Sequence, residues 1–442
     1  MKKIIVGIVI AIVVYFVSVN FFNHTQSVLL GVISLLVVYW TNSALSLGVV
    51  SLLPIVLFPS FGILTTKATT INYAHPIIYL FLGGFMLAIG VEKTKLHIFI
   101  ADKILNFFPS TPRGMIFSLS ITSALLSSIL SNTTTTLLLI SIAIFLSDDK
   151  NLKMRFALAI AYGASIGGIL TPIGTPPNLI LLGVMQEHNM EMIPFFRWVY
   201  LTAPLVIVML IVVNLVLSFG VKDVEIQRVG DVEPLDKVQR KVVYLMLALV
   251  ALLFINAPIR PYWDGLGLSD SGILLSFGLM LFAPPFNILK WEDDAKKIPY
   301  AIMFLFGAGF SIAKAFMATG LADELASRLL SVAHLTPIMM LLVIAFVMTF
   351  ITEITSNTAL TSLMLPVIYS VATQSSIDTT LFMMVATICA SYAFMLPIAT
   401  PPNAIAMGSG AVEVKNMLRY GFILNLIGIF CITIIARFFW SA

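Results

Sequence analysis

Charged side chains and cysteines are scarce in this sequence. Asp, Glu, Lys and Arg make up only 10% of the 442 residues, whereas 59% are hydrophobic. Mean hydropathy is +1.03, and several apolar runs reach about 20 residues, the length that crosses a bilayer as a helix. This composition excludes a soluble protein built around a single core. We therefore predict an all-α polytopic protein of the cytoplasmic membrane, in contact with the lipid bilayer.

The scarce cysteines and charges also narrow the range of partners. Cys389 and Cys431 both lie in apolar segments, so we interpret them as small core residues and not as a disulfide or a metal site. The net charge is only +4, and the basic residues collect in short polar connections instead of forming a stripe. We therefore predict no nucleic-acid partner. The five histidines form no cluster along the sequence, and we predict no cofactor.

The amino terminus resembles a signal peptide, because Lys2 and Lys3 precede an apolar run. The run is long for a signal sequence and no A-x-A cleavage site follows it, so residues 1–25 are predicted to be a retained first transmembrane helix. The only sizeable soluble connection is residues 221–241, with five basic and five acidic side chains. By the positive-inside rule, Lys2, Lys3 and this connection are all predicted to be cytoplasmic.

Two polar motifs occur twice at one constant separation. S-N-T stands at residues 131–133 and again at 356–358, and P-I-G-T-P-P-N at residues 172–178 returns as P-I-A-T-P-P-N at 397–403. Both pairs are 225 positions apart. One separation that holds over roughly a hundred residues indicates an internal repeat. We predict the following units: repeat 1 over residues 26–220, the cytoplasmic connection over 221–241, and repeat 2 over 242–442.

Both repeats contain backbone that lipid would not tolerate. The adjacent prolines of the two T-P-P-N motifs must end or break a helix, because proline lacks a backbone donor and clashes with the preceding turn. Broken backbone survives at membrane depth only where it is buried in protein or lines a wet cavity. We therefore predict two re-entrant helical hairpins, at about 113–147 and about 336–372, each with S-N-T at its tip. Each tip faces an interrupted helix, the place where secondary transporters bind their substrates.

The residue types at these tips and breaks suit two kinds of ligand. Helix amino termini carry positive partial charge, and Asn and Thr side chains add neutral donors, so together they favour a carboxylate. Freed carbonyls and hydroxyls favour a hard cation such as sodium. One seat of each kind per repeat indicates a dianion carried with cations. The absence of arginine from both motifs argues against a bidentate phosphate site.

Each motif taken alone also has an ordinary structural explanation. A single S-N-T is usually a helix cap and Pro-Pro-Asn usually a loop, so only their repetition inside apolar sequence favours a binding site. Glu353 and Lys314 are ionisable residues at membrane depth and are therefore functional candidates. Their counterparts in repeat 1, Ser128 and Ile89, are uncharged. A structural or snorkelling role is an equal alternative for both.

The paired motifs, together with F-L-G-G-F-M-L-A at residues 81–88, resemble the divalent anion/sodium symporter family over nearly the whole chain. The resemblance implies a homodimer with two inverted repeats, about eleven transmembrane helices, two re-entrant hairpins, and an elevator motion of a transport domain against a scaffold. The implied substrate contacts are Asn132, Thr133, Thr175, Asn357, Thr358, Thr400 and Pro401. The implied sodium ligands are Ser127, Ser131, Asn132 and Gly174 in repeat 1, and Thr352, Thr355, Asn357 and Ala399 in repeat 2.

The resemblance implies a secondary carrier of C4/C5 dicarboxylates of the succinate, malate, fumarate and 2-oxoglutarate class. S-N-T-T-T-T-L-L-L-I departs from the family pattern, because many sodium-coupled members have smaller residues and a proline after the first motif. Sodium symport and dicarboxylate exchange therefore both stay open, as does another anion such as citrate, tartrate or sulfate. A channel is disfavoured because it does not need inverted repeats with closed hairpins. An enzyme is disfavoured because it would need a catalytic cluster, and the acidic pair Asp148 and Asp149 lies in a connection next to Lys150.

Overall fold

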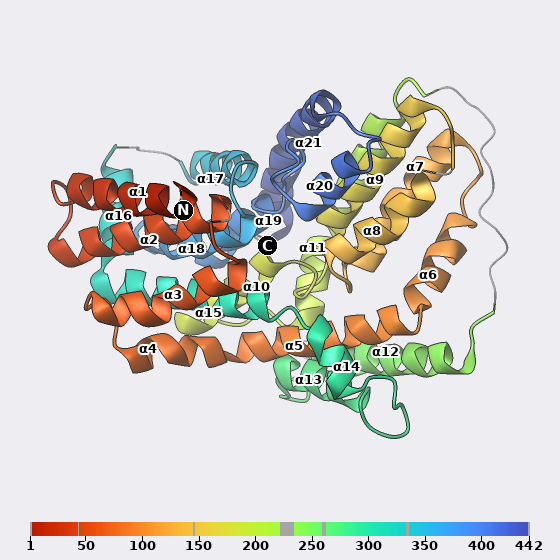
Figure 1. The fold of residues 1–442 in the computed structure, drawn as a ribbon, viewed down its shortest axis with the longest axis horizontal. Coiled ribbons are helices and arrows are strands. Elements are labelled where there is room, and N and C mark those ends of the chain that lie inside the picture. Colours follow the sequence, from red (N-terminus) through yellow and green to blue (C-terminus); the bar gives the residue numbers. More distant parts are fainter. Residues whose placement is uncertain are drawn as a thin grey trace.

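The chain folds into helices throughout the part that the computed structural model describes, without a strand in that part (Figure 1). The described residues are 2–42, 44–144, 146–221, 234–258, 262–332 and 336–440. The prediction of an all-α protein is confirmed. Most of the predicted cytoplasmic connection, residues 222–233, lies outside the described residues.

The helices repeat along the chain as the motifs do. The helices before the connection are α1 (Lys2–Ser18), α2 (His24–Asn42), α3 (Leu47–Ser60), α4 (Thr66–Thr70), η1 (Ile71–Ala74), α5 (Pro76–Lys93), α6 (Leu96–Leu105), α7 (Pro112–Ser127), α8 (Asn132–Ala143), α9 (Lys150–Gly167), α10 (Pro176–Glu187) and α11 (Phe195–Ser218). The helices after it are α12 (Lys237–Asn256), α13 (Asp270–Met280), α14 (Trp291–Asp294), η2 (Ala295–Lys297), α15 (Tyr300–Thr319), α16 (Leu321–Val332), α17 (Pro337–Thr352), α18 (Asn357–Gln374), α19 (Thr379–Cys389), α20 (Pro401–Gly408), α21 (Val414–Ile435) and η3 (Ala436–Trp440). Helices α7, α8 and α10 begin 225 positions before α17, α18 and α20.

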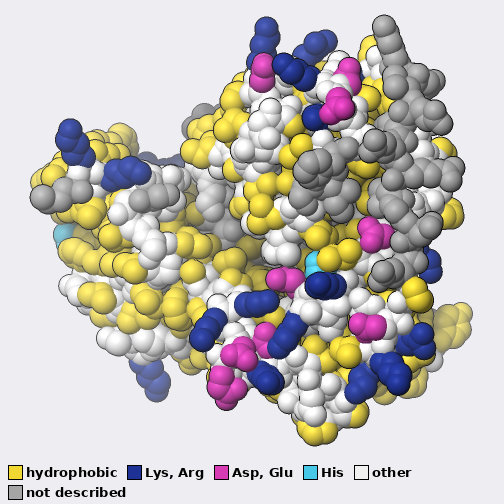
Figure 2. All heavy atoms as spheres, turned by 45° about the vertical axis from the view of Figure 1, so that its right-hand side comes forward, with side chains coloured by type: hydrophobic (Ala, Val, Ile, Leu, Met, Phe, Trp, Pro, Cys, Tyr) yellow, Lys and Arg dark blue, Asp and Glu magenta, His cyan; other side chains and the backbone are white. Residues whose placement is uncertain are grey.

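Several helices are long and apolar enough to cross a membrane on their own. Among the described residues these are α2, α4 with α5, α11, α12, α15, and α21 with η3. Large hydrophobic side chains on α1, α11, α12 and α21 are exposed, and Figure 2 shows a broad hydrophobic surface between groups of charged side chains. Such a surface is the one that lipid covers. The number of crossings, predicted as about eleven, is not tested by helix length and stays a prediction.

Each hairpin begins at a threonine that precedes a proline. The Thr111 side chain accepts a hydrogen bond from the backbone N–H of Gly114, and Thr336 accepts one from Met339. The proline that follows each threonine takes the first helical position, where a missing N–H costs nothing. The helices α7 with α8, and α17 with α18, form two helical hairpins, and their re-entrant insertion into the membrane stays a prediction.

Helices α5 and α15 run antiparallel and set the direction of the two hairpins. Lys297, beside the start of α15, lies 3.6 Å from Glu92 near the end of α5. At the other end, Asn72 Nδ2 donates a 3.2 Å hydrogen bond to Ser311 Oγ of α15. Hairpin 1 follows α5 and hairpin 2 follows α15, so they enter the molecule from opposite ends of a helix about 30 Å long. Inverted repeats predict this arrangement.

Small residues let hairpin 1 lie directly against the interrupted helix. A Cβ added to Gly163 would stand 2.5 Å from the carbonyl oxygen of Ser120, and one added to Gly167 would overlap Ala124. Only glycine permits this approach of α7 to α9. The close packing holds the tip of hairpin 1 beside the break between α9 and α10.

Candidate functional site

The first S-N-T forms the tip of hairpin 1, at the start of α8. Ser127 Oγ donates a 2.5 Å hydrogen bond to Asn132 Oδ1, so the end of α7 is tied to the first residue of α8. Thr136 Oγ1 donates to the Asn132 carbonyl at 2.7 Å. Ser131 Oγ accepts from the Thr134 N–H at 3.1 Å and donates to Thr134 Oγ1 at 2.9 Å. The threonines that depart from the family pattern therefore fold back onto the tip.

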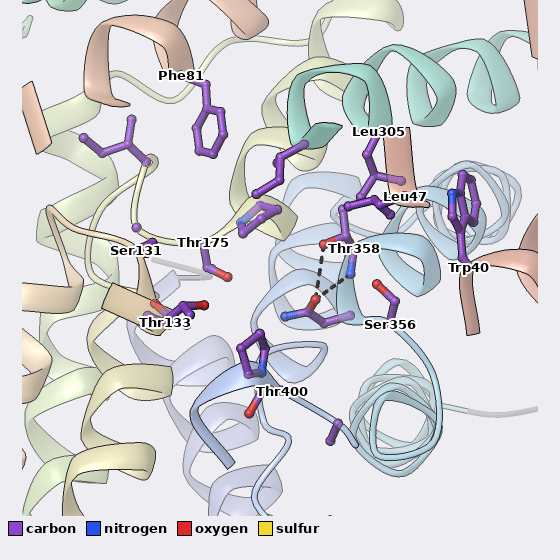
Figure 3. A pocket seen from close by; sticks show the side chains of 18 of the residues that line it. Trp40, Leu47, Phe81, Ser131, Thr133, Thr175, Leu305, Ser356, Thr358 and Thr400 are labelled. Atoms are coloured by element: carbon purple, nitrogen blue, oxygen red, sulfur yellow. Dashed lines mark hydrogen bonds between the residues drawn. The ribbon is translucent and has the colours of Figure 1, made fainter. Parts of the chain in front are cut away.

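The second S-N-T forms the tip of hairpin 2 with a different arrangement of its asparagine. Asn357 Oδ1 accepts from the backbone N–H of Thr358 at 2.8 Å and from its hydroxyl at 3.2 Å (Figure 3). Thr361 Oγ1 donates to the Asn357 carbonyl at 2.7 Å, as Thr136 does in hairpin 1. The helical frame of the two tips is thus the same, while the side-chain contacts of Asn132 and Asn357 differ.

The asparagines of the two T-P-P-N motifs hold the breaks in the interrupted helices. Asn178 Nδ2 donates to the carbonyls of Gly168 at 3.0 Å and Thr171 at 2.9 Å. Asn403 Nδ2 donates to the carbonyls of Ala393 at 2.8 Å and Leu396 at 3.0 Å. These acceptors stand ten and seven residues earlier, the same spacings as in the first motif. These bonds satisfy carbonyls that the end of a helix leaves free. Asn178 and Asn403 were not among the predicted site residues, and the recurrence of the motif is the sequence signal that points to their role.

Oxygens of the first implied sodium seat converge beside a glycine. A Cβ on Gly168 would lie 3.0 Å from Asn132 Oδ1 and 3.2 Å from the Gly174 carbonyl oxygen, so both oxygens come close to the same glycine. The hydroxyl of Ser127 bonds the same Asn132 oxygen. Neutral oxygens that converge in this way fit a hard cation. Ser131, the fourth implied ligand, lies at the tip but bonds Thr134.

The second implied sodium seat is less open. Thr352 Oγ1 donates to the Ala390 carbonyl at 2.7 Å, and Thr355 Oγ1 donates to Ile351 at 2.8 Å. The position equivalent to Gly168 is Ala393, which carries the Cβ that Gly168 lacks. The four implied ligands lie around hairpin 2 and the second break, but hydroxyls of two of them are bonded to backbone.

One cavity of about 390 Å³ joins both tips and both breaks. The predicted site residues that line it are Ser131, Asn132, Thr133, Gly174, Thr175, Thr355, Asn357, Thr358, Ala399, Thr400 and Pro401. Figure 3 shows labelled members of this set facing the same space from separate helices. Ser127 and Thr352 are completely buried and lie behind the lining. The structure thus brings together residues that are more than 200 positions apart in the sequence.

The electrostatics of the cavity come from backbone and neutral side chains. Among the described residues, its lining includes no Asp, Glu, Lys or Arg. Helices α8, α10, α18 and α20 all begin at this lining, and each amino terminus carries positive partial charge. The Nδ2 groups of Asn132 and Asn357 have no hydrogen-bond partner within the described chain, so both are available to a ligand. The cavity therefore suits an anion held by neutral donors.

Apolar side chains from four helices close the remaining wall. Trp40 of α2, Leu47 of α3, Phe81 of α5 and Leu305 of α15 also line the cavity (Figure 3). Phe81 is the first residue of the F-L-G-G-F-M-L-A stretch that supports the family resemblance. Nothing in the sequence pointed to Trp40, because its position at the cavity depends on how α2 packs.

Glu353, a functional candidate from the sequence, acts as a structural link. Its carboxylate is 3% exposed and accepts hydrogen bonds from the N–H groups of Phe394, Met395 and Leu396 at 2.8 to 3.0 Å. Asn425 Nδ2 of α21 donates a fourth at 2.7 Å. Four donors compensate the buried charge. Glu353 thus joins hairpin 2 to the second break and to α21.

Lys314, the other ionisable candidate, pairs with an acidic side chain away from the cavity. Its Nζ lies 3.4 Å from Glu187 Oε2, and this contact joins the second half of α15 to the end of α10. Neither residue belongs to the cavity lining. The structure favours the structural alternative for Lys314.

Sequence comparisons relate the chain to transporters over most of its length. A family model described as "citrate transporter" matches residues 35–387. The sodium-dependent dicarboxylate transporter SdcS of Staphylococcus saprophyticus is 31% identical over 434 residues, covering 90% of this chain and 83% of the relative. The SdcS of Staphylococcus aureus strain RF122 is 30% identical over 474 residues, covering 98% and 91%.

Solved structures share the fold at low sequence identity. The YdaH transporter of Alcanivorax borkumensis superposes with a TM-score of 0.62 at 13% identity, covering 84% of this chain and 87% of its own. MtrF of Neisseria gonorrhoeae, described with a class of antimetabolite efflux pumps, gives 0.61 at 13% identity, covering 95% and 96%. The fold is therefore a transporter fold. The chain is a multi-pass transporter of the plasma membrane, not an enzyme, and it belongs to the divalent anion/sodium symporter family.

Proposed function

We propose that the chain is a secondary active transporter of C4/C5 dicarboxylates, the class that includes succinate, malate, fumarate and 2-oxoglutarate. The observation that carries this proposal is the cavity between two S-N-T tips and two T-P-P-N breaks, lined by neutral donors and helix amino termini. The printed names of the staphylococcal relatives, sodium-dependent dicarboxylate transporters, support the same substrate class.

In this proposal each carboxylate of the substrate is bound at one hairpin tip. Asn132 and Thr133 donate to one carboxylate, and Asn357 and Thr358 donate to the other. Thr175, Thr400 and Pro401 line the breaks on either side. Two tips match two carboxylates, whereas citrate brings a third that has no equivalent seat. Neutral donors bind a dianion less tightly than an arginine fork would, which favours its release.

We propose sodium as the coupling ion, carried as a co-substrate. The better candidate seat lies beside Gly168, because Asn132 Oδ1 and the Gly174 carbonyl already converge there. Binding requires the Ser127 hydroxyl to turn its proton away from Asn132 and present a lone pair. Exchange of dicarboxylates without sodium is the second candidate for the coupling mode. The Ser131 hydroxyl, which a sodium ion would use as a ligand, is hydrogen-bonded to Thr134.

We propose an elevator movement in which the hairpins travel with the interrupted helices. Hydrogen bonds of Glu353 join hairpin 2 to its break and to α21, and the close approach of α7 to α9 joins hairpin 1 to its break. The remaining wall, with Trp40, Leu47 and Leu305, belongs to helices outside this unit. In this proposal those helices form the scaffold of a homodimer.

Uptake of labelled succinate into proteoliposomes tests the substrate and the coupling together. One set of vesicles receives an inward sodium gradient, a second contains internal dicarboxylate without sodium, and a third has neither. Uptake in the first set alone supports symport, and uptake in the second alone supports exchange. The dicarboxylate proposal would be rejected if neither set took up succinate while the protein transported another labelled anion. Competition by citrate or sulfate would then identify the class of that anion.

A further inference from the structure

A second region of the molecule has the features of a ligand site, away from the transport cavity. A cavity of about 730 Å³ lies between the start of α9 and the segment that joins α20 to α21, and a cavity of about 540 Å³ lies between α11 and α21. Arg155, Arg419 and Tyr420 line both cavities. The two cavities are therefore neighbours that share one basic wall.

Arg155 is the fixed element of this wall. Its side chain is only 7% exposed, its Nε donates to Asn151 Oδ1 at 2.8 Å, and its Nη1 donates to the carbonyls of Leu217 and Phe219. Its guanidinium lies 5.7 Å from the Tyr420 ring centre. These contacts leave Nη2 without a partner among the described residues. A buried guanidinium whose last donor group has no protein partner indicates an anionic ligand.

The larger cavity carries more positive than negative charge. Lys150, Lys153 and Arg419 line it with Arg155, whereas Glu413 is the one acidic side chain in its described lining. Two further acids stand beside this lining. Asp148 lies 3.8 Å from Lys153 and is fully exposed, so it screens that lysine only weakly. Asp149 caps the start of α9 by accepting a hydrogen bond from the Leu152 N–H. Figure 2 shows charged side chains gathered at the upper edge of the molecule, the end where α9 and α21 are labelled in Figure 1.

The smaller cavity is apolar and opens to the surface that lipid covers. Its lining includes Leu215 of α11, which is 61% exposed, and Phe219 directly after α11, which is 84% exposed. Ile423 of α21, which is 39% exposed, also lines it. Phe219 stands just before the connection predicted to be cytoplasmic. The groove therefore runs from the basic cavity along two membrane helices.

We propose that this region binds an anionic phospholipid of the cytoplasmic leaflet. The phosphate lies in the basic cavity, where it accepts hydrogen bonds from Arg155 Nη2 and Arg419, and an acyl chain lies in the groove between α11 and α21. Basic pockets between membrane helices on the cytoplasmic side are known to bind such headgroups. The charge of the larger cavity and the apolar lining of the smaller one are both needed for this occupant.

Thermal unfolding of the purified full-length protein in neutral detergent tests this site. Short-chain phosphatidylglycerol is titrated and compared with phosphatidylcholine of the same chain length and with inorganic phosphate. We expect stabilisation by phosphatidylglycerol at the lowest concentration, with an affinity that falls as salt rises. Arg419→Gln and Lys150→Gln should each weaken phosphatidylglycerol binding about fivefold, because one basic residue near a membrane surface contributes about 1 kcal/mol. Lys415→Gln, an exposed neighbour on α21 outside both linings, should leave it unchanged.

Three outcomes would overturn the proposal. Equal binding of both lipids would show that charge does not select the ligand. Inorganic phosphate that binds as well as phosphatidylglycerol would assign the cavity to a soluble anion. An equal loss in Lys415→Gln and Arg419→Gln would show a diffuse surface effect in place of a site. Arg155 is left intact because its removal would free the end of α11, so the test does not depend on a variant that unfolds.

Discussion

At the scale of single residues, the two S-N-T asparagines are alike in position and different in contact. Asn132 Oδ1 accepts a hydrogen bond from the Ser127 hydroxyl. Asn357 Oδ1 instead accepts hydrogen bonds from the N–H and the hydroxyl of Thr358. Both contacts orient the amide so that its oxygen faces protein atoms. The NH₂ group is then the part that remains as a donor, which is what the proposed carboxylate contact requires.

Removal of either amide tests this assignment. Asn132→Ala and Asn357→Ala should each reduce dicarboxylate uptake by at least about tenfold, because a hydrogen bond to a charged group contributes about 1.5–3 kcal/mol. Thr134→Ala, in the same turn, should change uptake much less. Uptake is measured in proteoliposomes with equal amounts of folded protein. Wild-type uptake by Asn132→Ala would place the substrate elsewhere.

Glu353 allows a second test at this scale, directed at stability. In Glu353→Gln one acceptor oxygen becomes an NH₂ group that faces backbone N–H donors, so buried donors lose their partner. We expect a loss of about 3 kcal/mol in the free energy of unfolding, seen as a lower midpoint in thermal denaturation. Ser128→Ala at the matched position of repeat 1 is the control, because the Ser128 side chain bonds only Leu125 of its own helix in the described chain. An unchanged midpoint for Glu353→Gln would contradict the linking role.

At the scale of elements, small residues decide how closely hairpin 1 approaches its break. The carbonyl oxygen of Gly168 lies 2.5 Å from the place where a Cβ on Gly174 would stand, so the backbone crosses itself closely at the start of α10. In repeat 2 the same position is Ala399 and its backbone tolerates a side chain. The repeats therefore share helices and hydrogen bonds but not the tightness of the break.

This difference predicts unequal responses to matched substitutions. Gly174→Ala should displace backbone at the first cation seat, at a cost of about 1–3 kcal/mol, and reduce uptake strongly. Ala399→Gly removes a methyl group without a clash and should retain most uptake. Both variants are compared by uptake rate and, if transport depends on sodium, by the sodium concentration for half-maximal uptake. Equal effects of the two would mean that the close contact at Gly168 does not shape the site.

At the scale of the whole molecule, the antiparallel pair α5 and α15 relates the two repeats. The contacts of Lys297 with Glu92 and of Asn72 with Ser311 place the ends of these helices at opposite faces. The hairpins that follow them consequently reach one cavity from two sides. An alternating-access carrier needs such an arrangement, because each hairpin can then serve one face of the membrane.

Accessibility labelling tests the opposite entry of the hairpins. Thr111→Cys and Thr336→Cys, at matched and exposed positions, are introduced into a background that lacks Cys389 and Cys431. A membrane-impermeant thiol reagent should label them from opposite faces of oriented vesicles. Loss of each cap costs about 1 kcal/mol, which the hairpins should tolerate. Labelling of both from the same face would reject the inverted arrangement.

Local patterns were sufficient to predict the helical fold and many of the residues that line the cavity, whose roles as ligands stay a prediction. Prolines after Thr111 and Thr336 stand where the hairpins begin, because the first turn of a helix accepts proline without the loss of a hydrogen bond. The separation of 225 positions identified the tips and the breaks without any knowledge of packing. Polar residues in apolar sequence are costly, so their repetition was a strong signal for a site.

The sequence by itself determined that this is a helical membrane protein with two copies of one unit, because composition, proline placement and motif spacing act locally along the chain. Only the tertiary structure decided the rest. It assigned Glu353 to a link between hairpin 2 and α21, because three backbone N–H groups and Asn425 converge there only after folding. It also made the two implied cation seats unequal, because the close approach of Asn132 Oδ1 and the Gly174 carbonyl to Gly168 depends on contacts between segments distant in sequence. The types of residue at the site can be read from the sequence. The distances between them depend on how the two repeats pack against each other.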